Sequence, residues 1–526
     1  MNNKFITKQE AAELINDGDT ICTVGMTLTS AAESILSAIE QRFLSEGSPK
    51  QLTLVHAAGQ CNRIRGNQHF AHQGMVKRII GSHWGLAPRW MQMINDNQVE
   101  AYCLPQGQMV HLYGAMAAGL PGRLSKVGLG TFIDPDLEGG RMNAKTLALP
   151  PLVEKVSFKG EEWLWYPEIP LDVVVIRGTH ADSKGNLTTD EEAMSLEVLH
   201  AVLAAKRFGG KVIAQVKYCV EEGTLHPKRV TVPASFIDHI VICDNPQEDH
   251  RQSSSWFFDP TLCGDIRTPV QQTTPLPLDI RKLIGRIACR YLTENCVINL
   301  GTGIPNDVIG SIIQEENASK HVDITVESGI WGGVQAGGID FGIGRNLSAM
   351  ISHQDQMLYY NGAGVDITYM GAGEMDACGH VNATLLGNIC PGAGGFIDIT
   401  QNARHVVFCS TFTAKGLDIR CENGQLKIIR EGDIRKLVDN VRQISWNADV
   451  ARQINQTMHF VTERAVFTLG GKVPVLIEIA PGIDLERDIL AHMDFMPEIS
   501  PDLKVMPSSL FEEAPFGLVS YLYSQY

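Results

Sequence analysis

Short runs of apolar residues alternate with amphipathic stretches throughout the chain. Residues 171–176, 211–216 and 239–243 are such runs, rich in Val and Ile and of the length of a buried strand. Residues 7–10, Thr-Lys-Gln-Glu, form a capping-box pattern that predicts the start of a helix. The alternation predicts an α/β fold with mainly parallel sheets.

Residues 260–278 are rich in Pro and Thr and have no helical period, which predicts a linker. After it, apolar residues return at helical spacing between Leu283 and Leu292. The chain has 526 residues, more than the roughly 250–300 at which one hydrophobic core usually divides. We therefore expect two domains, residues 1–259 and 279–526, joined by this linker.

The two halves resemble each other, although the first carries a long extra segment before Asp172. The anchors that recur in the same order are Gly25 and Gly301, Gly59 and Gly329, Asp172 and Asp366, Asp182 and Asp376, and Gly185 and Gly379. This pattern predicts two open α/β domains related by internal duplication. In such folds ligands bind at the carboxyl ends of the strands, so we expect the site between the domains.

The overall charge excludes several kinds of partner. The formal net charge is −15, which leaves no broad basic surface for nucleic acid. The first residues contain no apolar signal segment, and no apolar run has transmembrane length. We expect a cytoplasmic protein that does not bind a membrane. The 12 cysteines show no C-x-x-C spacing, so we expect small buried thiols and no structural metal.

The most informative segment is residues 323–333, in which a β-branched strand ends in Glu327 and a glycine-rich loop follows. A carboxylate at a strand end is held on a rigid element, and the glycines leave room for a ligand. An isolated glutamate in such a place is usually only solvated. The matching position in the first half is Ala57, so the fold does not require a glutamate there, which favours a chemical role for Glu327.

A second segment, residues 300–307, is a strand end followed by a Gly-Thr-Gly turn and a helix start at Pro305. Free backbone N–H groups at such a turn suit an anion or a polar amide chain, although an ordinary βα turn has the same sequence. The turn lacks the third glycine of a dinucleotide fingerprint and the Gly-Lys pair of a phosphate loop.

Three further segments are weaker signals. Gly394 and Gly395 lie in a glycine-rich loop whose amides could face a developing oxyanion, and Gln106 offers a neutral amide to a carboxylate or thioester oxygen. The glycine loop is equally compatible with an ordinary loop, and the segment around Gln106 taken alone indicates a plain turn rather than a site. We assign no role to residues 81–85, Gly-Ser-His-Trp-Gly.

Together these segments resemble the class I CoA-transferases, and among them the single-chain acetate and short-chain acyl enzymes, including the propionate enzymes. The resemblance covers nearly the whole chain. The segments that carry it are residues 104–107, 128–135, 224–228, 325–329, 394–398, 462–467, 478–482 and 493–495.

The resemblance implies the family's fold and a ping-pong transfer of CoA between acyl-CoA and short-chain carboxylic acids. It implies that Glu327 is the nucleophile, which carries CoA as a transient glutamyl thioester. From the ordinary pKa of a glutamate we expect Glu327 to be ionised at pH 7. It implies that Gly394 and Gly395 are the oxyanion pair and Gln106 the substrate amide. The CoA-contacting turn would consist of Gly301, Thr302, Gly303, Ile304 and Pro305.

CoA would be a substrate, so we expect no tightly bound cofactor, and the family suggests a homodimer or homotetramer. Trp331 is bulkier than the family's usual residue, and we expect it to reshape the acyl pocket so that rates fall for acids longer than about four carbons. Four alternatives stay open: an acyl-CoA hydrolase on the same scaffold, a 3-oxoacid CoA-transferase, a sugar-phosphate isomerase or sensor domain on a related α/β fold, and a non-catalytic subunit.

Overall fold

The computed structural model describes residues 4–269 and 275–523, so residues 270–274 of the predicted linker lie outside the described part. The three apolar runs form strands as predicted, and the first helix, α1 (Lys8–Glu13), begins with the predicted capping box at Thr7. After the linker, α8 (Ile280–Cys289) confirms the predicted helix. It ends before Leu292, so the predicted helical spacing extends one turn too far.

Each half of the chain is built on five parallel strands in the same spatial order. In the first half these are β2 (Leu52–His56), β1 (Thr20–Thr23), β8 (Val173–Asp182), β10 (Lys211–Val220) and β12 (His239–Ile242). In the second half they are β14 (Val322–Val326), β13 (Cys296–Leu300), β19 (Ile367–Gly371), β22 (His405–Cys409) and β28 (Thr457–Val461). The shared order confirms the duplicated two-domain α/β fold.

The repeated aspartates make the same contacts in both halves. Asp172 accepts the backbone N–H of Thr20 at the start of β1, and Asp366 accepts that of Val297 in β13, both at 2.8 Å. These contacts show that Thr20 in the first half corresponds to Val297 in the second, so Val24 corresponds to Gly301. The predicted pair of Gly25 and Gly301 is therefore wrong by one residue. The other anchors keep their predicted correspondence.

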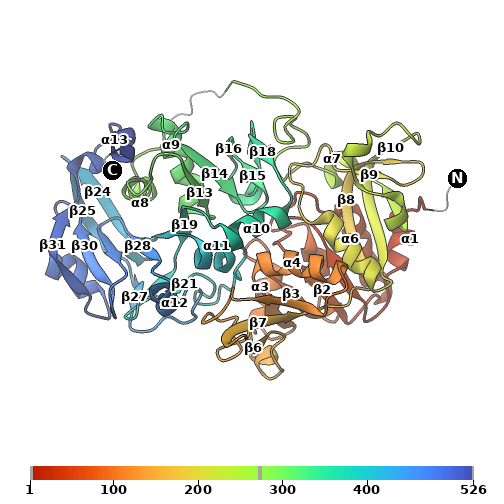
Figure 1. The fold of residues 1–526 in the computed structure, drawn as a ribbon, viewed down its shortest axis with the longest axis horizontal. Coiled ribbons are helices and arrows are strands. Elements are labelled where there is room, and N and C mark those ends of the chain that lie inside the picture. Colours follow the sequence, from red (N-terminus) through yellow and green to blue (C-terminus); the bar gives the residue numbers. More distant parts are fainter. Residues whose placement is uncertain (1–3, 270–274, 524–526) are drawn as a thin grey trace.

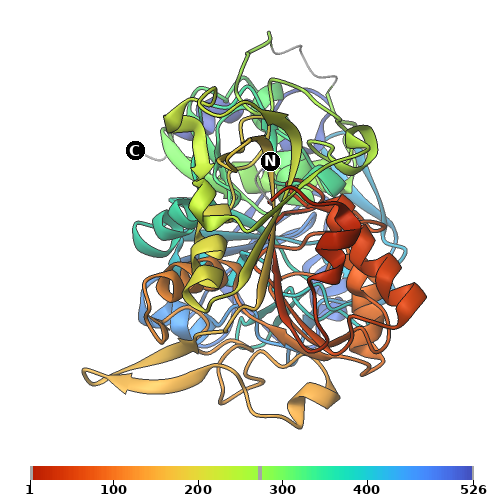
Figure 2. The ribbon, with the colours of Figure 1, turned by 90° about the vertical axis from the view of Figure 1, so that its right-hand side faces the viewer.

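The two sheets differ at their edges. The first has nine strands and is extended by β3 (Val76–Gly81), β4 (Glu100–Cys103), β9 (Leu187–Thr188) and β11 (Val230–Val232). The second has ten and is extended by β15 (Ile330–Trp331), β18 (Ala349–Met350), β29 (Ala465–Thr468), β30 (Val475–Ile479) and β31 (Glu498–Val505). The extra segment of the first half also forms a hairpin of β6 (Glu154–Phe158) and β7 (Glu161–Pro167), which projects from the body in Figure 2.

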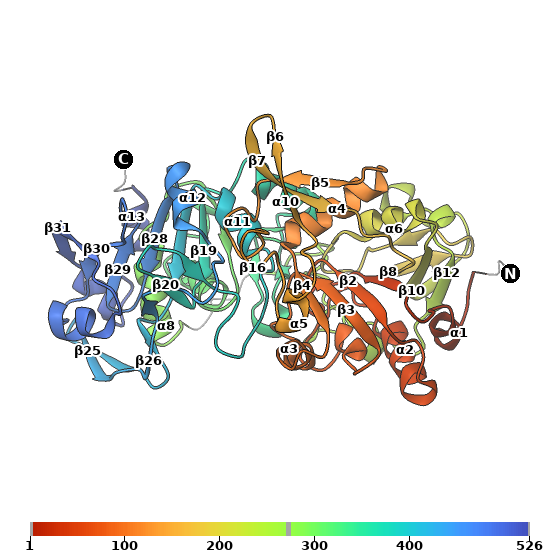
Figure 3. The same ribbon diagram turned by 90° about the horizontal axis from the view of Figure 1, so that it is seen from below.

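The two halves lie side by side along the long axis of the molecule (Figure 1). At their junction, α10 (His353–Gly362) and α11 (Phe396–Asn402) of the second half pack against α4 (Gln106–Ala117) of the first (Figures 1 and 3). One continuous core of buried apolar residues includes side chains from both halves. The junction is therefore a packed interface that fixes one half relative to the other.

The remaining helices cover or connect the sheets. They are α2 (Glu33–Glu46), α3 (Pro88–Asn95), α5 (Ala144–Leu147), α6 (Val198–Arg207), α7 (Pro246–Asp249), α9 (Gly310–Glu315), α12 (Ala448–Gln453) and α13 (Leu518–Tyr523). No helix in the described part of the chain is long and apolar enough to cross a membrane.

Candidate active site

Glu327 is the first residue after β14, and its side chain is buried, with 8% of its surface exposed. The chain turns back directly after it at Gly329, whose φ is +102° and where a Cβ atom would lie 2.1 Å from the Ile351 carbonyl oxygen. Burial raises the pKa of Glu327 to about 7. The expected ionisation of Glu327 at pH 7 is therefore only partial in this structure, because burial disfavours the charged carboxylate.

The sheet register confirms that Glu327 corresponds to Ala57. Ile21 pairs with Leu54 in the first half, and Ile298 pairs with Ile324 in the second. Three residues beyond these partners lie Ala57 and Glu327. The duplicated fold therefore forms this strand end with or without a carboxylate, so the fold alone does not account for Glu327.

A cavity of about 410 Å³ lies at the junction, and residues of both halves line it. It brings together seven of the predicted site residues: Gln106, Gly301, Thr302, Gly303, Glu327, Gly394 and Gly395. Ile304 and Pro305 do not line it; Pro305 is buried at the start of a π-helical turn behind the glycine turn. The sequence thus predicted residues that are more than 200 positions apart and meet only in the folded chain.

Gly394 and Gly395 have different roles in the cavity wall. The Gly394 N–H donates to the Ser82 carbonyl at 2.8 Å, and its carbonyl accepts the Gln106 N–H at 3.0 Å. The predicted oxyanion contact from the Gly394 amide is therefore wrong in this conformation, because that amide already has an acceptor. The Gly395 N–H has no acceptor among the described residues, and Gly395 lies directly against Glu327.

The Gly301–Pro305 turn is held at its ends and open in the middle. The Gly301 N–H donates to the Tyr369 carbonyl at 2.8 Å, and its carbonyl accepts the Asn306 N–H at 3.0 Å. Gly303 has a φ of +84°, and a Cβ atom there would meet nothing within 4 Å. The turn therefore leaves space for a ligand beside the backbone.

A basic residue that sequence reasoning missed lies near this turn. Arg281 of α8 forms an ion pair with Asp307 at 2.7 Å, at the edge of the cavity. The two residues are 26 positions apart, so the sequence around the turn does not reveal the contact.

His83 is a cavity residue to which sequence reasoning assigned no role. Its ring lies close to two glycines: a Cβ atom on Gly59 would lie 2.8 Å from Nδ1, and one on Gly85 would lie 2.7 Å from Cε1. Burial lowers the pKa of His83 to about 4, so the imidazole is neutral at pH 7. Among the described residues, no group forms a hydrogen bond with this ring. The sequence contains one sign of this arrangement, the glycines Gly81 and Gly85 on either side of His83.

Trp331 does not line the cavity, so it does not contribute to the cavity wall as expected from its place after Glu327. The chain reverses at Gly329, and the antiparallel pairing places Trp331 beside Thr325, away from the strand end. The Trp331 indole N–H donates to Gln356 at 2.7 Å instead. The apolar lining comes from residues such as Leu86, Phe341 and Phe396.

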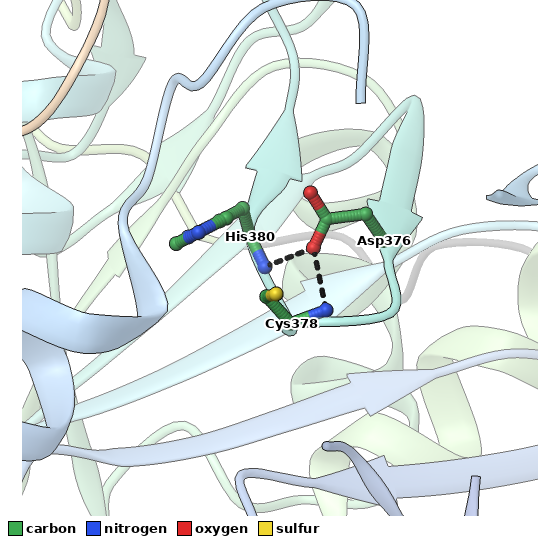
Figure 4. Close-up of side chains that lie close together, drawn as sticks. All are labelled: Asp376, Cys378 and His380. Atoms are coloured by element: carbon green, nitrogen blue, oxygen red, sulfur yellow. Dashed lines mark hydrogen bonds between the residues drawn. The ribbon is translucent and has the colours of Figure 1, made fainter. Parts of the chain in front are cut away.

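Asp376, Cys378 and His380 place potential metal-ligand atoms within 4.8 Å of one another (Figure 4). The Asp376 carboxylate accepts the backbone N–H groups of Cys378 and His380 at 3.0 and 2.9 Å. In the first half, Asp182 accepts the N–H groups two and four positions further on, from a lysine and an asparagine. The duplicated turn therefore accounts for the carboxylate without a metal.

Comparison with known proteins identifies the chain. The family model described as Coenzyme A transferase matches residues 5–242. Over 522 residues, 98% of both proteins, the chain is 40% identical to caffeate CoA-transferase of Acetobacterium woodii. The chain belongs to the coenzyme A transferase family. This transferase is also 36% identical to acetate CoA-transferase YdiF of Escherichia coli O157:H7, over 98% of its own length and 96% of the relative.

The fold of this transferase is that of a solved relative. Its structure matches the acyl-CoA transferase YdiF of Escherichia coli O157:H7, solved as a thioester complex with CoA, with a TM-score of 0.91. The identity is 34%, and the match covers 98% of this chain and 97% of the other. The resemblance predicted from the sequence and its fold class are confirmed.

Proposed function

We propose that this transferase moves coenzyme A between a short-chain acyl-CoA and a free carboxylate, with acetate as one of the acids. Glu327 is the nucleophile and carries CoA as a thioester between two half-reactions. The observation that carries this proposal is the buried Glu327 carboxylate in the cavity between the two halves, beside the free N–H of Gly395. The acetate CoA-transferase relative and its thioester complex with CoA support it.

The reaction proceeds through exchanges of similar bonds. The Glu327 carboxylate attacks the acyl carbonyl, the carbon–sulfur bond breaks, and CoA leaves as a thiolate while a mixed anhydride forms. The thiolate then attacks the Glu327 carbonyl carbon, the first acid leaves as its carboxylate, and a glutamyl-CoA thioester remains. A second acid reverses both steps. Substrate, intermediate and product are all thioesters, so the exchange needs no energy source and no tightly bound cofactor.

The surrounding groups have separate tasks in this scheme. Gln106 and the Gly395 amide hold the acyl oxygen as charge develops on it. Gly394 fixes the start of α4 through its backbone, and the turn of Gly301, Thr302, Gly303, Ile304 and Pro305 holds the CoA chain. A burial deep enough to raise the pKa of Glu327 also keeps water from the anhydride.

We also propose the organisation of the molecule. Residues 1–259 and 279–526 are its two domains and residues 260–278 the linker. The protein acts in the cytoplasm, where acyl-CoA is available, as a homodimer or homotetramer. Light scattering after size-exclusion chromatography measures that assembly directly.

The deciding experiment is to incubate the protein with acetyl-CoA and no acceptor acid. Intact mass should show an adduct of CoA less one water, and peptide mapping should place it on Glu327. Glu327→Gln and Glu327→Ala should form no adduct and show no exchange. Glu327→Asp keeps the carboxylate but withdraws it, and a misplacement of about 1 Å can cost about 10²-fold in rate.

The same incubation separates the transferase from the acyl-CoA hydrolase alternative. A transferase releases about one equivalent of acetate and then stops until an acid is added, whereas a hydrolase releases CoA continuously. A panel of acceptors with 3-oxoacids and caffeate beside acetate and propionate measures the acid preference. Normal exchange by Glu327→Ala would exclude the proposed mechanism.

A further inference from the structure

Three buried polar side chains form a continuous chain of hydrogen bonds that ends at the cavity. The Gln106 amide nitrogen lies 2.9 Å from His353 Nε2, and His353 Nδ1 lies 2.7 Å from a carboxylate oxygen of Glu197. Glu197 and His353 are 0% exposed and Gln106 is 2% exposed. Water therefore does not compete for these contacts.

This series of hydrogen bonds crosses the junction between the two halves twice. Gln106 is the first residue of α4 and Glu197 immediately precedes α6, both in the first half. His353 is the first residue of α10 in the second half, which lies beside α4 in Figures 1 and 3. The backbone N–H of His353 donates to the Leu196 carbonyl at 3.3 Å, and this contact holds the imidazole next to Glu197.

Two contacts set the arrangement of protons in this structure: the Gln106 NH₂ group faces His353 Nε2, and a Glu197 carboxylate oxygen faces Nδ1. A carboxylate only accepts, so His353 Nδ1 carries the proton that it donates to Glu197. His353 Nε2 is then a bare acceptor, and the Gln106 NH₂ group donates to it. The second N–H of that amide remains available, and both His353 and Gln106 oppose the rise in the pKa of the Glu327 carboxyl group.

We propose that Glu197 and His353 are positioning residues, which hold the Gln106 amide with its NH₂ group toward the reacting oxygens. The inference rests on the proposed function, because it assigns a task to the Gln106 amide in that reaction. Without the acceptor at His353 Nε2, only the long 3.4 Å contact from the Ser82 hydroxyl to the Gln106 carbonyl oxygen opposes rotation of the amide, and that hydroxyl also donates to the Ala57 carbonyl. After such a rotation the Gln106 carbonyl oxygen would face the Glu327 carboxylate and the acyl oxygen, and both would repel it.

The packing argues against a purely stabilising role for the pair. The second carboxylate oxygen of Glu197 is buried and has no hydrogen-bond partner among the described residues. A buried carboxylate oxygen without a hydrogen-bond partner lowers the free energy of unfolding, so the pair does not contribute mainly to stability.

The start of α4 is held independently of His353. The Asp398 carboxylate accepts the Gly107 N–H at 2.8 Å and the Gln108 side-chain amide at 2.7 Å. A change at His353 therefore alters the orientation of the Gln106 amide and leaves the helix in place.

The test is a double-mutant cycle on the full-length protein with acetyl-CoA and propionate. In the wild-type background, His353→Leu should lower kcat by about 10- to 100-fold, with little change in the KM for acetyl-CoA. In the Gln106→Ala background, the same change should alter kcat by no more than about twofold, because the group that it positions is already gone. His353→Gln, which places an amide oxygen near the Nε2 position, should recover part of the lost rate.

The matched control is His111→Leu. His111 is buried in α4, and its ring nitrogens have no hydrogen-bond partner among the described residues. It makes the same exchange of a buried imidazole for an apolar side chain, and kcat should stay near the wild-type value. If His353→Leu does not fold, Glu197→Gln replaces it, because a glutamine amide can donate to Nδ1 and reverse the proton arrangement.

Independent effects of the His353 and Gln106 changes would overturn the inference, and so would wild-type turnover by His353→Leu or by Gln106→Ala. The covalent adduct is measured in every variant to separate this failure from a failure of the proposed function. Additive effects with a wild-type adduct on Glu327 reject the positioning pair alone. A wild-type protein that forms no adduct rejects the proposed function and the inference together.

Discussion

Gly395 lies directly against Glu327: a Cβ atom on Gly395 would sit 3.2 Å from the Glu327 carboxyl carbon. The φ of Gly395 is −80°, an ordinary value for any residue. Glycine is therefore needed here for space and not for backbone conformation. The free N–H of Gly395 can approach the reacting carboxyl group only because no side chain intervenes.

Gly395→Ala should lower kcat by about 10²-fold or more, because the methyl group occupies space beside the reacting carboxyl carbon. Thermal stability should hardly change, since the backbone is unstrained. Gly371→Ala is the matched control: it also lines the cavity, but its Cβ atom would lie 3.6 Å from the nearest atom, an ordinary contact. Equal losses in the two variants would contradict the proposed role of Gly395.

The pH dependence of the first half-reaction should reflect Glu327. Its pKa is raised to about 7, and only the ionised carboxylate can attack. The kcat/KM for acetyl-CoA should therefore rise with pH below about 7 and level off above it. The kcat/KM for the acceptor acid should lack this limb, because Glu327 is then bound to CoA and has no proton to lose. If kcat/KM for the acceptor acid also rose with pH below about 7, the rise would have to come from a group other than Glu327.

Ionisation of Glu327 should also cost folding stability. Its pKa is about 7 in the folded protein and about 4.5 when unfolded, so the folded protein binds the proton more tightly. The free energy of unfolding should then fall by roughly 3 kcal/mol as pH rises from 4.5 to 7. Glu327→Gln cannot ionise, so it should unfold at a higher temperature than wild type at pH 8 and at a similar one at pH 5. An equal difference at both pH values would refute this cause.

Gly303→Val should weaken CoA binding without unfolding the protein. The positive φ of Gly303 makes a side chain there cost about 1–2 kcal/mol in backbone strain, although it would meet no neighbour. Gly223→Val is the control, since Gly223 has a φ of +81° and equally open surroundings but does not line the cavity. Both should lose similar stability, whereas only Gly303→Val should raise the KM for acyl-CoA. An unchanged KM would place CoA elsewhere.

Gly85→Ala should push the His83 ring into the cavity, because its Cβ atom would lie 2.7 Å from the ring. We expect a narrower acid preference, with propionate and butyrate losing more rate than acetate. His83→Ala should relieve the clash and restore the longer acids in the double variant. Trp331→Phe, outside the cavity, should leave the ratio of rates among the acids unchanged. A shifted ratio in Trp331→Phe would restore its predicted role in the acyl pocket.

The sequence by itself determined the two-domain α/β fold, the duplication and Glu327 as the nucleophile candidate. These follow from local patterns: apolar runs that alternate with helices, repeated Asp and Gly spacings, and a glutamate at a strand end where the other half has Ala57. Such patterns can be recognised in a sequence because the periods of strands and helices depend on residues that are close to one another along the chain.

Only the tertiary structure decided how these groups act on one another. Burial raised the pKa of Glu327, and the reversal of the chain at Gly329 turned Trp331 away from the cavity. The Ser82 carbonyl accepts the Gly394 N–H, which is therefore not available to a substrate. His353 and Glu197 belong to no recognisable motif, because their roles depend on contacts across 156 and 247 positions of sequence. Burial and hydrogen bonds between distant segments arise only when the two halves pack together, and a linear pattern does not encode them.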